Sequence, residues 1–497
     1  MSINIDLVHS QSRTVQAAWI AFASLVSMSV GIVTAAILSR YLSKGEYGTY
    51  RQVIYVYSTL LMFFSMGLPR AYSYFLARVS LGEGKSLVCK LNLMFLGLSG
   101  VFTLLLFGGA DCIADILRNP ALAANMRIFS ITPMFLMPVL GLESIMATYK
   151  RTYLGALFTI ISRLFQIAAI VFPVIFIRAD AQMAVYGFVV SSLITFVVGM
   201  IIMRIPFRKI KREKTKIKLV DIWHFSFPIF TASIWGFVIG SASQFFISRY
   251  FGIDEFALFA NGYMELPFVG MVTGATSTIL LPEFSKMRHE NKGFGEFIKL
   301  WNNVIVKSSL IIYPLAIYCC VFSKEIMTSL YGEKYVDSVV FFQIVTIVNL
   351  VRIMPYAPIM LALNRGKQFS FAHMMSAIFI VLADWIIVYF APSSYLIAII
   401  ATLSVCLCTL IVLKDIAKVM KISIVDLIPF VLICRILVSA IICSVVMRFM
   451  VLFLDIDNCW IILSVTFPIF CVLYFIVATC FRLHYGDIIK PFFCRKT

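Results

Sequence analysis

Long apolar segments separated by short polar connections recur along the whole chain. Each is about 20 residues long, enough for a helix to cross a hydrocarbon core of about 30 Å. The short alternating segments of a β-barrel are absent. We therefore predict an all-α polytopic membrane protein with about fourteen transmembrane helices, centred on residues 17–38, 53–77, 91–110, 128–149, 156–177, 184–203, 224–248, 258–281, 300–322, 339–363, 370–390, 395–413, 428–447 and 459–480.

The composition supports this prediction and excludes several other functions. The 497 residues are 61% hydrophobic and 13% charged, whereas soluble domains have roughly 25% charged residues. The first apolar segment is too long for the core of a signal peptide and no cleavage site follows it, so we expect no cleaved leader. The cysteines and histidines lack metal-ligand spacing and no P-loop is present, so we expect no metal, no cofactor and no ATP hydrolysis.

The distribution of lysine and arginine predicts the orientation. If the N-terminus is cytoplasmic, the cytoplasmic segments hold 27 of these residues and the opposite side holds 10. By the positive-inside rule, both termini then lie in the cytoplasm. The run Arg204–Lys218 holds eight of the 27. We interpret this run as a linker, with attraction to anionic lipid as the alternative, and the net charge of +18 as an orientation signal rather than a nucleic-acid footprint.

A twelve-residue segment occurs twice in the chain. Ser39–Tyr50 recurs as Ser248–Phe259, 209 positions later, with Ser, Arg, Tyr and Glu identical. An internal repeat in a membrane protein indicates two structural halves with a substrate site between them. We predict an N-terminal lobe of six helices, a basic cytoplasmic linker, a C-terminal lobe of six helices, and two additional helices with a cytoplasmic tail, at residues 1–203, 204–220, 221–413 and 414–497.

Charged residues inside the predicted helices point to an anionic substrate. Each costs about 2.5–3.5 kcal/mol at mid-membrane, so it should face a cavity or a partner. Arginine binds phosphate oxygens with two parallel hydrogen bonds and lysine binds them as a point charge. Cations outnumber acids, which predicts a phosphate-bearing substrate: the cations are Arg70, Arg163, Lys307, Arg352 and Arg435, and the acids are Glu143, Glu265 and Asp384.

Four of these cations are the first candidates for substrate binding. Arg70, Arg163 and Lys307 each lie roughly 10 Å inside the cytoplasmic boundary of their helices, at 1.5 Å per residue. Arg352 lies near mid-membrane, and Arg70 and Arg352 are the strongest candidates. Arg435 lies outside the two six-helix lobes, so we assign it to packing or snorkelling.

Other candidates keep a structural alternative. Arg40 and Arg249 of the repeat are further candidates for substrate binding, but anchoring at the outer interface explains them equally well. Glu143, Glu265 and Asp384 are candidates for proton or ion coupling, with hydrogen-bonded structural acids as the alternative. Glu143 and Arg163 lie at similar depth on consecutive helices, so an ion pair between them is as good an explanation as a substrate role.

Several short motifs resemble those of a known family. They are Ala36–Leu42 followed by Glu46–Tyr50, Gly67–Arg70, Leu281–Lys286 and Leu330–Tyr335. With fourteen helices and a basic central loop, the chain resembles the polysaccharide flippases of the multidrug/oligosaccharidyl-lipid/polysaccharide exporter superfamily, the O-antigen (Wzx-type) transporters in particular.

The resemblance implies a fold, a substrate and a location. The implied fold has two six-helix lobes around a central cavity plus two peripheral helices. The implied activity moves undecaprenyl-diphosphate-linked oligosaccharide from the cytoplasmic to the periplasmic leaflet of the bacterial inner membrane by alternating access. Cavity arginines would hold the diphosphate, and Arg70, Arg163, Lys307 and Arg352 match that role by position. Membrane lipid and polysaccharide polymerase or assembly proteins are candidate partners.

Two other functions remain open at this stage. A cation-coupled drug or metabolite exporter of the same superfamily would depend on Glu265 and Asp384 instead of the arginines. A polysaccharide-assembly enzyme would need catalytic residues in a sizeable loop outside the membrane, and no such loop is present, so we expect no enzyme.

Overall fold

The chain is helical throughout its described part. The structure is a computed structural model that describes residues 13–454, 456–481 and 483, and no β-strand occurs among them. The predicted cytoplasmic tail after residue 483 lies outside the described residues. The all-α fold predicted from the hydropathy pattern is confirmed.

Eleven helices of the described chain are long and apolar enough to span a membrane, and a bent pair of helices would make a twelfth. The bent pair is α2 (Lys44–Ser65) and α3 (Leu68–Leu76), which meet at 41°. The predicted span at 224–248 lies within α11 (Leu219–Tyr250). The one at 258–281 overlaps only in part with α13 (Pro267–His289), because the helix is broken between Gly262 and Pro267. The chain is thus a multi-pass membrane protein, and the count of fourteen stays a prediction.

Contacts divide the chain into two compact units. Unit 1 extends to Phe237 and includes Ser248–Ala257, and unit 2 comprises Val238–Ile247 and the chain from Leu258 onward. Helices α11 and α12 (Ile253–Gly262) therefore contribute residues to both units. We describe each unit by itself.

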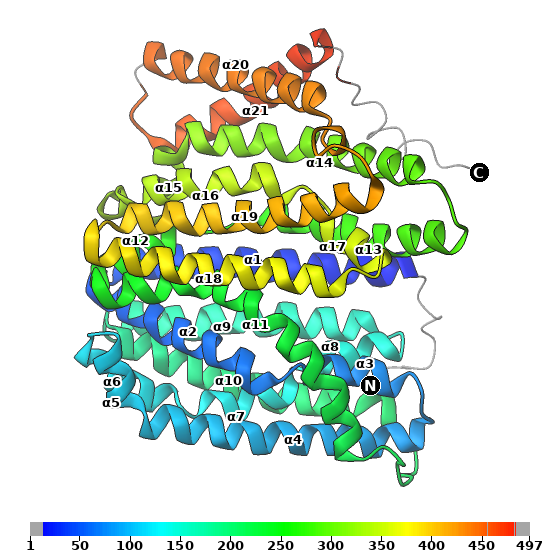
Figure 1. Cartoon of the computed structure of the whole chain (residues 1–497). Helices are drawn as coiled ribbons and strands as arrows, with labels where there is room; N and C mark the ends of the chain where they lie inside the picture. Colours follow the sequence, from blue (N-terminus) through cyan, green and yellow to red (C-terminus); the bar gives the residue numbers. More distant parts are fainter. Residues whose placement is uncertain (1–12, 455, 482, 484–497) are drawn as a thin grey trace, which may run out of the picture. The chain divides into compact units, whose positions relative to one another are not determined.

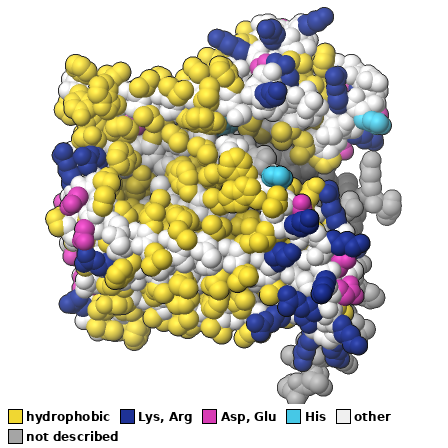
Figure 2. All heavy atoms as spheres, turned by 60° about the horizontal axis from the view of Figure 1, so that its bottom comes forward, with side chains coloured by type: hydrophobic (Ala, Val, Ile, Leu, Met, Phe, Trp, Pro, Cys, Tyr) yellow, Lys and Arg dark blue, Asp and Glu magenta, His cyan; other side chains and the backbone are white. Residues whose placement is uncertain are grey.

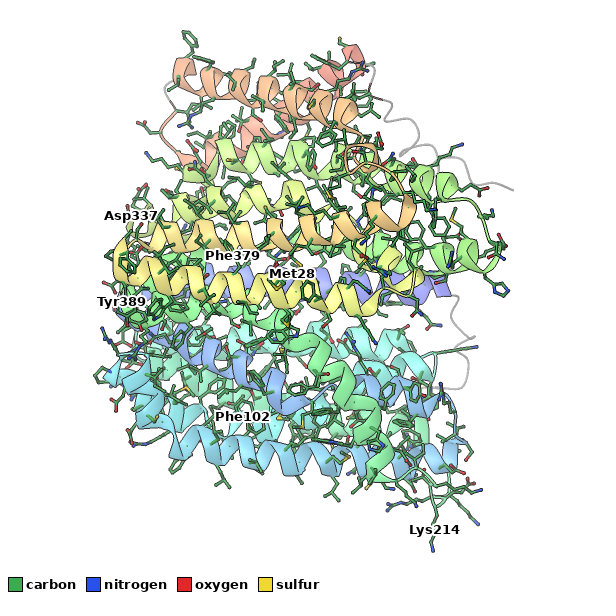
Figure 3. The ribbon with its side chains drawn as sticks, in the orientation of Figure 1. Met28, Phe102, Lys214, Asp337, Phe379 and Tyr389 are labelled. Carbon is green, nitrogen blue, oxygen red and sulfur yellow. The ribbon has the colours of Figure 1, made fainter. Side chains whose placement is uncertain are left out.

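Aromatic side chains pack between the long helices of unit 1, whose ribbons are drawn in Figure 1. Tyr57 of α2 stacks on Phe102 of α4 with ring centroids 5.9 Å apart, and meets Phe129 of α6 edge-on at 5.2 Å. Such pairs add to the gain from burying large apolar surfaces. Figure 3 marks Phe102 within the helices. The remaining elements of this unit are α1 (Arg13–Tyr41), α4 (Leu81–Gly108), α5 (Ala110–Ile116), α6 (Pro120–Phe129), α7 (Thr132–Leu136), η2 (Met137–Val139), α8 (Leu142–Thr148), α9 (Thr152–Phe176), α10 (Ala181–Met203) and η3 (Ile205–Phe207).

Buried polar contacts join α14 of unit 2 to η5 and to α21. Trp301 of α14 donates Nε1–H to the Leu427 carbonyl at 2.8 Å, and the hydroxyls of Tyr318 and Thr466 lie 2.8 Å apart. The elements of this unit are α14 (Phe294–Val321), α15 (Ser323–Tyr331), η4 (Glu333–Tyr335), α16 (Ser338–Arg352), α17 (Tyr356–Ala362), α18 (Gly366–Phe390), α19 (Ser394–Met420), η5 (Val425–Leu427), α20 (Phe430–Leu454) and α21 (Cys459–Cys480), with α13.

Several spans are interrupted instead of continuous. Between α2 and α3, Met66 and Gly67 adopt left-handed backbone with φ of 47° and 70°, and Pro69 starts α3. In unit 2, α16 ends at Arg352, and Pro355 precedes α17. Non-helical backbone at membrane depth is tolerated only where it is buried in protein or lines a water-filled cavity. The interruptions therefore mark places where a polar substrate could meet the helices.

The surface has the pattern of a membrane protein. Figure 2 shows hydrophobic side chains along the lengths of the helices and lysine and arginine gathered at their ends. Large apolar side chains such as Leu104 and Phe176 are exposed within α4 and α9. An apolar exposed band of this kind is stable in lipid.

Candidate functional site

The two copies of the repeated segment meet in unit 1. Gln52, two residues after the first copy, donates from Nε2 to the Ser248 hydroxyl of the second copy at 2.8 Å. Asn119 donates to the Gln52 side-chain oxygen at 2.6 Å and to the Thr49 hydroxyl at 3.0 Å. All four side chains are buried. Both copies therefore lie at the same end of unit 1, as the predicted topology requires.

Close backbone packing accompanies this network. A Cβ added at Gly48 would lie 2.5 Å from Ile253 Cγ2 and 2.6 Å from the Ile253 carbonyl oxygen. The Tyr55 and Phe256 rings meet edge-on with centroids 5.9 Å apart. The absence of a side chain at Gly48 thus allows Ile253 of the second copy to pack directly against the backbone of α2.

Arg249 of the second copy has a structural partner. Its guanidinium donates to the Ile116 carbonyl at the C-terminal end of α5 and lies over the Tyr250 ring at 5.5 Å. A cation is stabilised at a helix C-terminus because the last carbonyls are unsatisfied and carry partial negative charge. Arg40 lies exposed in the last turn of α1. A substrate role for either arginine stays a prediction.

Arg163 lies near the middle of α9 and lines three cavities of unit 1. The first, about 170 Å³, lies among α1, α2, α9 and α10. The second, about 420 Å³, lies among α1, α8 and α9, and the third, about 340 Å³, extends from α2 to α10. Gln166 accepts a hydrogen bond of 2.7 Å from Arg163. The side chain is exposed, so the guanidinium can reach a ligand in any of these cavities.

Glu143 lines two of the same cavities but does not pair with Arg163. Its carboxylate accepts a hydrogen bond of 2.7 Å from the Thr159 hydroxyl. No ion pair joins Glu143 to Arg163 in the described part of the chain. The ion pair offered as an alternative is therefore not formed, and the cavities keep one arginine and one carboxylate side by side with the hydroxyls of Ser24, Ser27, Ser162, Ser191, Ser192 and Thr195.

The structure adds Arg51 to the candidates for substrate binding. The predicted span at 53–77 leaves this residue in the connection before it, outside the membrane. Helix α2 begins at Lys44, so Arg51 lies two turns inside it and lines the 170 Å³ cavity with Arg163 and Gln166. The capping serine Ser43, whose hydroxyl accepts from the Glu46 backbone N–H, is the signal that could have found this start. Unit 1 thus brings two arginines to one cavity.

Arg70 occupies the first turn of α3, directly after the interruption that follows α2. The side chain is exposed and forms no hydrogen bond or ion pair with any residue that the structure describes. Ser144 of α8 holds the same turn by donating to the Pro69 carbonyl at 3.1 Å. Arg70 is therefore held on a fixed turn with its guanidinium available.

In unit 2, Arg352 pairs with Glu265. Arg352 is the last residue of α16, and Glu265 lies in the turn before α13, two residues from its first residue. A cation at a helix C-terminus and an acid at a helix N-terminus are both favoured by the helix dipole. The side chains are 32% and 55% exposed, so the pair is accessible and contributes little to stability. Arg352, predicted to bind the substrate, and Glu265, predicted to couple transport to an ion, thus form one ion pair.

Asp384 of α18 is fully buried and only half satisfied. One carboxylate oxygen accepts a hydrogen bond of 2.7 Å from Ser243 of α11, while the other has no hydrogen-bond partner among the described residues. Buried polar atoms are nearly always paired. A proton or a small cation would satisfy the second oxygen.

The remaining candidate, Lys307, lies exposed on α14 and bonds to no described residue. Among the candidates, Arg163 and Glu143 share cavities in unit 1, and Arg352 pairs with Glu265 in unit 2. Arg70 and Lys307 line none of the three cavities and form no ion pair with a described residue. No group of metal ligands occurs among the residues that the structure describes.

Comparison with known proteins gives the family and the fold. A sequence model of the family described as "Polysaccharide biosynthesis protein" matches residues 37–340. Among curated proteins, none matches the chain by sequence. The solved structure of the lipid II flippase MurJ in an inward closed conformation is similar, with a TM-score of 0.73 and 15% identity, over 96% of this chain and 100% of that one.

Drug transporters have a similar fold at lower scores. The Vibrio cholerae MATE transporter VcmN in the bent form has a TM-score of 0.55 and 12% identity, over 82% of this chain and 98% of its own. An inward-facing MATE transporter of the MOP superfamily has a TM-score of 0.57 and 12% identity, over 84% and 98%. These matches show a similarity of fold. The chain belongs to the polysaccharide biosynthesis protein family and has the fold of the multidrug/oligosaccharidyl-lipid/polysaccharide exporter superfamily.

Proposed function

We propose that the protein is a flippase for undecaprenyl-diphosphate-linked oligosaccharide, the repeat unit of an O-antigen or another surface polysaccharide. It moves this lipid from the cytoplasmic to the outer leaflet of the bacterial inner membrane by alternating access. Both termini are cytoplasmic, and polysaccharide polymerase or assembly proteins receive the product. Family membership supports the polysaccharide part of this proposal, and the fold shared with a lipid II flippase supports the lipid-linked part.

One observation carries the proposal. Arg163 lies near the middle of a membrane helix, exposed to three cavities, and Arg51 shares one of them. An arginine at this depth is costly without an anion, because no water is available in the bilayer core. Two guanidinium groups can bind the non-bridging oxygens of a diphosphate, each through two parallel hydrogen bonds. The serine and threonine hydroxyls around the same cavities suit a sugar.

The other cations have roles in the same scheme. Arg70 and Arg352 each lie where a helix is interrupted, which is where transporters of other folds hold their substrates. Glu265 balances Arg352 until the anionic substrate arrives, and the diphosphate then replaces the carboxylate as the partner of Arg352.

The test is a flipping assay in vesicles that contain only this protein. A fluorescent undecaprenyl-diphosphate-linked oligosaccharide is placed in both leaflets, and a membrane-impermeant quencher reports the fraction that becomes accessible. The matched probe carries the same sugar and prenyl chain joined without phosphate. Flipping of the diphosphate lipid alone supports the proposal, and equal flipping of both lipids contradicts the diphosphate site.

The second candidate function is a cation-coupled exporter of drugs or metabolites, and Asp384 favours it. A buried carboxylate with one unsatisfied oxygen fits a coupling site for a proton or cation. Coupling and lipid flipping are compatible, so Asp384 also fits a gradient-driven flippase. The two functions differ in substrate: an exporter would move small molecules in vesicles that contain no lipid-linked sugar.

A further inference from the structure

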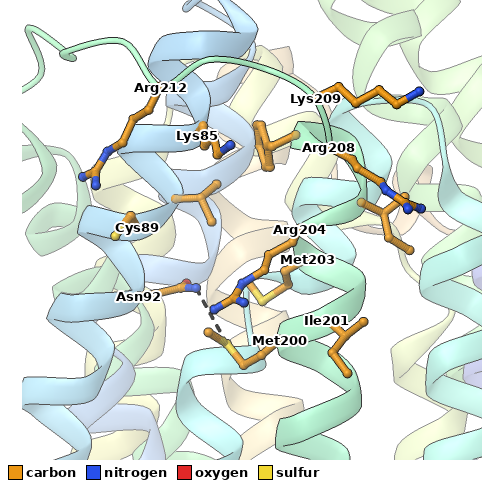
Figure 4. A pocket seen from close by; sticks show the side chains of 13 residues that line it. Lys85, Cys89, Asn92, Met200, Ile201, Met203, Arg204, Arg208, Lys209 and Arg212 are labelled. Carbon is orange, nitrogen blue, oxygen red and sulfur yellow. Dashed lines mark hydrogen bonds between the residues drawn. The ribbon is translucent and has the colours of Figure 1, made fainter.

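A basic cavity of about 600 Å³ lies in unit 1 where the ends of α4 and α10 meet the linker (Figure 4). The function proposed above does not use it. Apolar residues form much of its wall, including Val88 of α4, Met200 of α10 and Phe207 of η3. Its cationic lining consists of Lys85, Arg204, Arg208, Lys209 and Arg212, with Asn92 as a further polar group.

Hydrogen bonds hold the linker against α4 and so fix the cavity. Lys85 donates from Nζ to the Ile210 carbonyl at 2.9 Å, and Arg212 donates from Nε to the Ser86 hydroxyl at 3.1 Å. The Glu213 backbone N–H donates to the Gly82 carbonyl at 3.1 Å. A Cβ at Gly82 would lie 2.4 Å from Glu213 Cδ, so the Glu213 side chain would have to shift to admit a larger residue. The linker is therefore an ordered wall and not only a connection.

Three of the five cations have no partner in the described structure. Arg204, Arg208 and Lys209 form no side-chain hydrogen bond or ion pair with any described residue, and all three are exposed. Figure 4 shows the Arg204 guanidinium extending toward Asn92 and Met200. Clustered cations repel one another, so the arrangement favours a bound anion.

Apolar stripes lead from this cavity along both helices. Cys89, which lines the cavity, is followed at helical spacing by Leu93 and Leu96 on the same face of α4. Ile201, which also lines the cavity, lies one helical turn after Val197 on the same face of α10. Leu93 is 68% exposed and Ile201 is 61% exposed. A basic cavity continued by exposed apolar stripes has the polarity pattern of a phospholipid, with a phosphate at one end and acyl chains at the other.

We propose that this cavity binds the phosphate headgroup of an anionic phospholipid, whose acyl chains lie along the stripes of α4 and α10. Basic pockets between helices at the cytoplasmic surface are suited to such headgroups. The proposal is independent of the flippase function, since it involves neither Arg163 nor Arg352. A soluble phosphate compound could satisfy the cations but would leave the stripes unused.

The test measures lipid binding to the full-length protein in detergent by native mass spectrometry. The probes are palmitoyl-oleoyl phosphatidylglycerol, phosphatidylcholine with the same chains, and glycerol 3-phosphate as the soluble headgroup. The variant replaces three cavity cations, Arg204→Ala, Arg208→Ala and Lys209→Ala. The matched control removes three positive charges from the same linker outside the cavity, Lys211→Ala, Lys214→Ala and Lys216→Ala. Figure 3 shows Lys214 projecting away from the helices.

We expect the cavity variant to bind the first phosphatidylglycerol about tenfold more weakly or worse, since each basic residue near an anionic headgroup adds to the attraction. The control variant should retain wild-type affinity, and neither phosphatidylcholine nor glycerol 3-phosphate should compete at equal concentration. Equal losses in both variants would overturn the site in favour of diffuse attraction. Effective competition by glycerol 3-phosphate would assign the cavity to a soluble phosphate compound.

A steric variant keeps the proposal testable if the triple variant does not fold. Cys89→Trp fills the cavity from α4 without altering any charge. It should weaken phosphatidylglycerol binding as the triple variant does, while Cys112→Trp, an exposed residue of α5 outside the cavity, should not. Unchanged binding in Cys89→Trp would overturn the proposal.

Discussion

Gln52 donates a buried hydrogen bond to Ser248, and this bond joins the two copies of the repeated segment at a distance of 2.8 Å. The same Gln52 accepts from Asn119, so one side chain connects three parts of unit 1. The second half of the chain thus begins by docking its own copy of the segment against the first copy. The repeat is a packing device as well as a trace of two related halves.

Replacing Gln52 by leucine should destabilise the protein. The Ser248 hydroxyl would lose its partner and the Asn119 amide would lose one of its two acceptors while both stay buried, and an unsatisfied buried group costs about 1–3 kcal/mol. The melting temperature in detergent, followed by tryptophan fluorescence, should fall by several degrees. Ser58→Ala is the control, because the Ser58 hydroxyl is exposed and bonds only to carbonyls of its own helix. If Gln52→Leu has the same melting temperature as the control variant, the hydrogen-bond network does not stabilise the protein and the prediction is wrong.

Two glycines of α2 should respond oppositely to alanine. At Gly48 the added Cβ would meet Ile253 at 2.5 Å, so Gly48→Ala should lower stability by about 1–3 kcal/mol through overpacking. At Gly45 the nearest atom would be 3.7 Å away, so Gly45→Ala should be neutral or stabilise by about 0.5–1 kcal/mol through helix propensity. Thermal melting of the two variants decides this. Equal effects would contradict the close approach.

Arg163 should be needed for transport but not for folding. Loss of charge-assisted hydrogen bonds to the diphosphate predicts a fall in flipping rate of about ten- to a hundredfold for Arg163→Ala. Arg163→Lys should keep part of the activity, since lysine keeps the charge but cannot form the two parallel hydrogen bonds of a guanidinium. Arg178→Ala is the control at the exposed connection between α9 and α10. Wild-type flipping by Arg163→Ala, with normal protein levels, would exclude this residue from the site.

The pair of Arg352 and Glu265 can be tested by exchanging its members. Arg352→Ala should reduce flipping about tenfold or more, because a bidentate phosphate contact is lost. The double variant Arg352→Glu with Glu265→Arg should melt like the wild type, because the exposed pair contributes little to stability, but it should not recover flipping, since the arginine would then stand on the wrong element. Restored flipping in the exchanged protein would show that the pair is purely structural.

Asp384 should determine any dependence on an ion gradient. Asp384→Asn keeps a side chain that can accept from Ser243 but cannot take up a proton or bind a cation by charge. Flipping driven by an imposed proton or sodium gradient should therefore fall to the rate without a gradient. Ser243→Ala removes the hydrogen bond alone and should keep the response. A full gradient response in Asp384→Asn would assign coupling elsewhere.

The helices could be predicted from hydropathy because lipid requires every backbone group to be bonded within its own segment. The interruption after Ser65 was wrongly included in a continuous span at 53–77, although Gly67 and Pro69 are its local signals. The start of α2 was placed too late, which removed Arg51 from the candidates. These errors concern element boundaries, where local propensity competes with packing.

The grouping of the candidate residues could not be predicted in the same way. Depth along a helix was sufficient to select Arg163 and Arg352, because position in a span follows from counting residues. Whether Glu143 or Glu265 becomes an ion-pair partner depends on which helix faces which, and that requires tertiary packing. The linker cavity arises from contacts between α4 and residues that follow α10, so the sequence could predict a basic linker with attraction to anionic lipid as an alternative, but not a cavity.

The most direct test of the flippase account is made in the source organism after deletion of the gene. Lipid-linked oligosaccharide in each leaflet and surface polysaccharide are quantified together. The account predicts that the lipid-linked intermediate accumulates in the cytoplasmic leaflet while surface polymer disappears, with recovery by the wild-type gene and not by Arg163→Ala. Unchanged surface polysaccharide and no accumulated intermediate would contradict it.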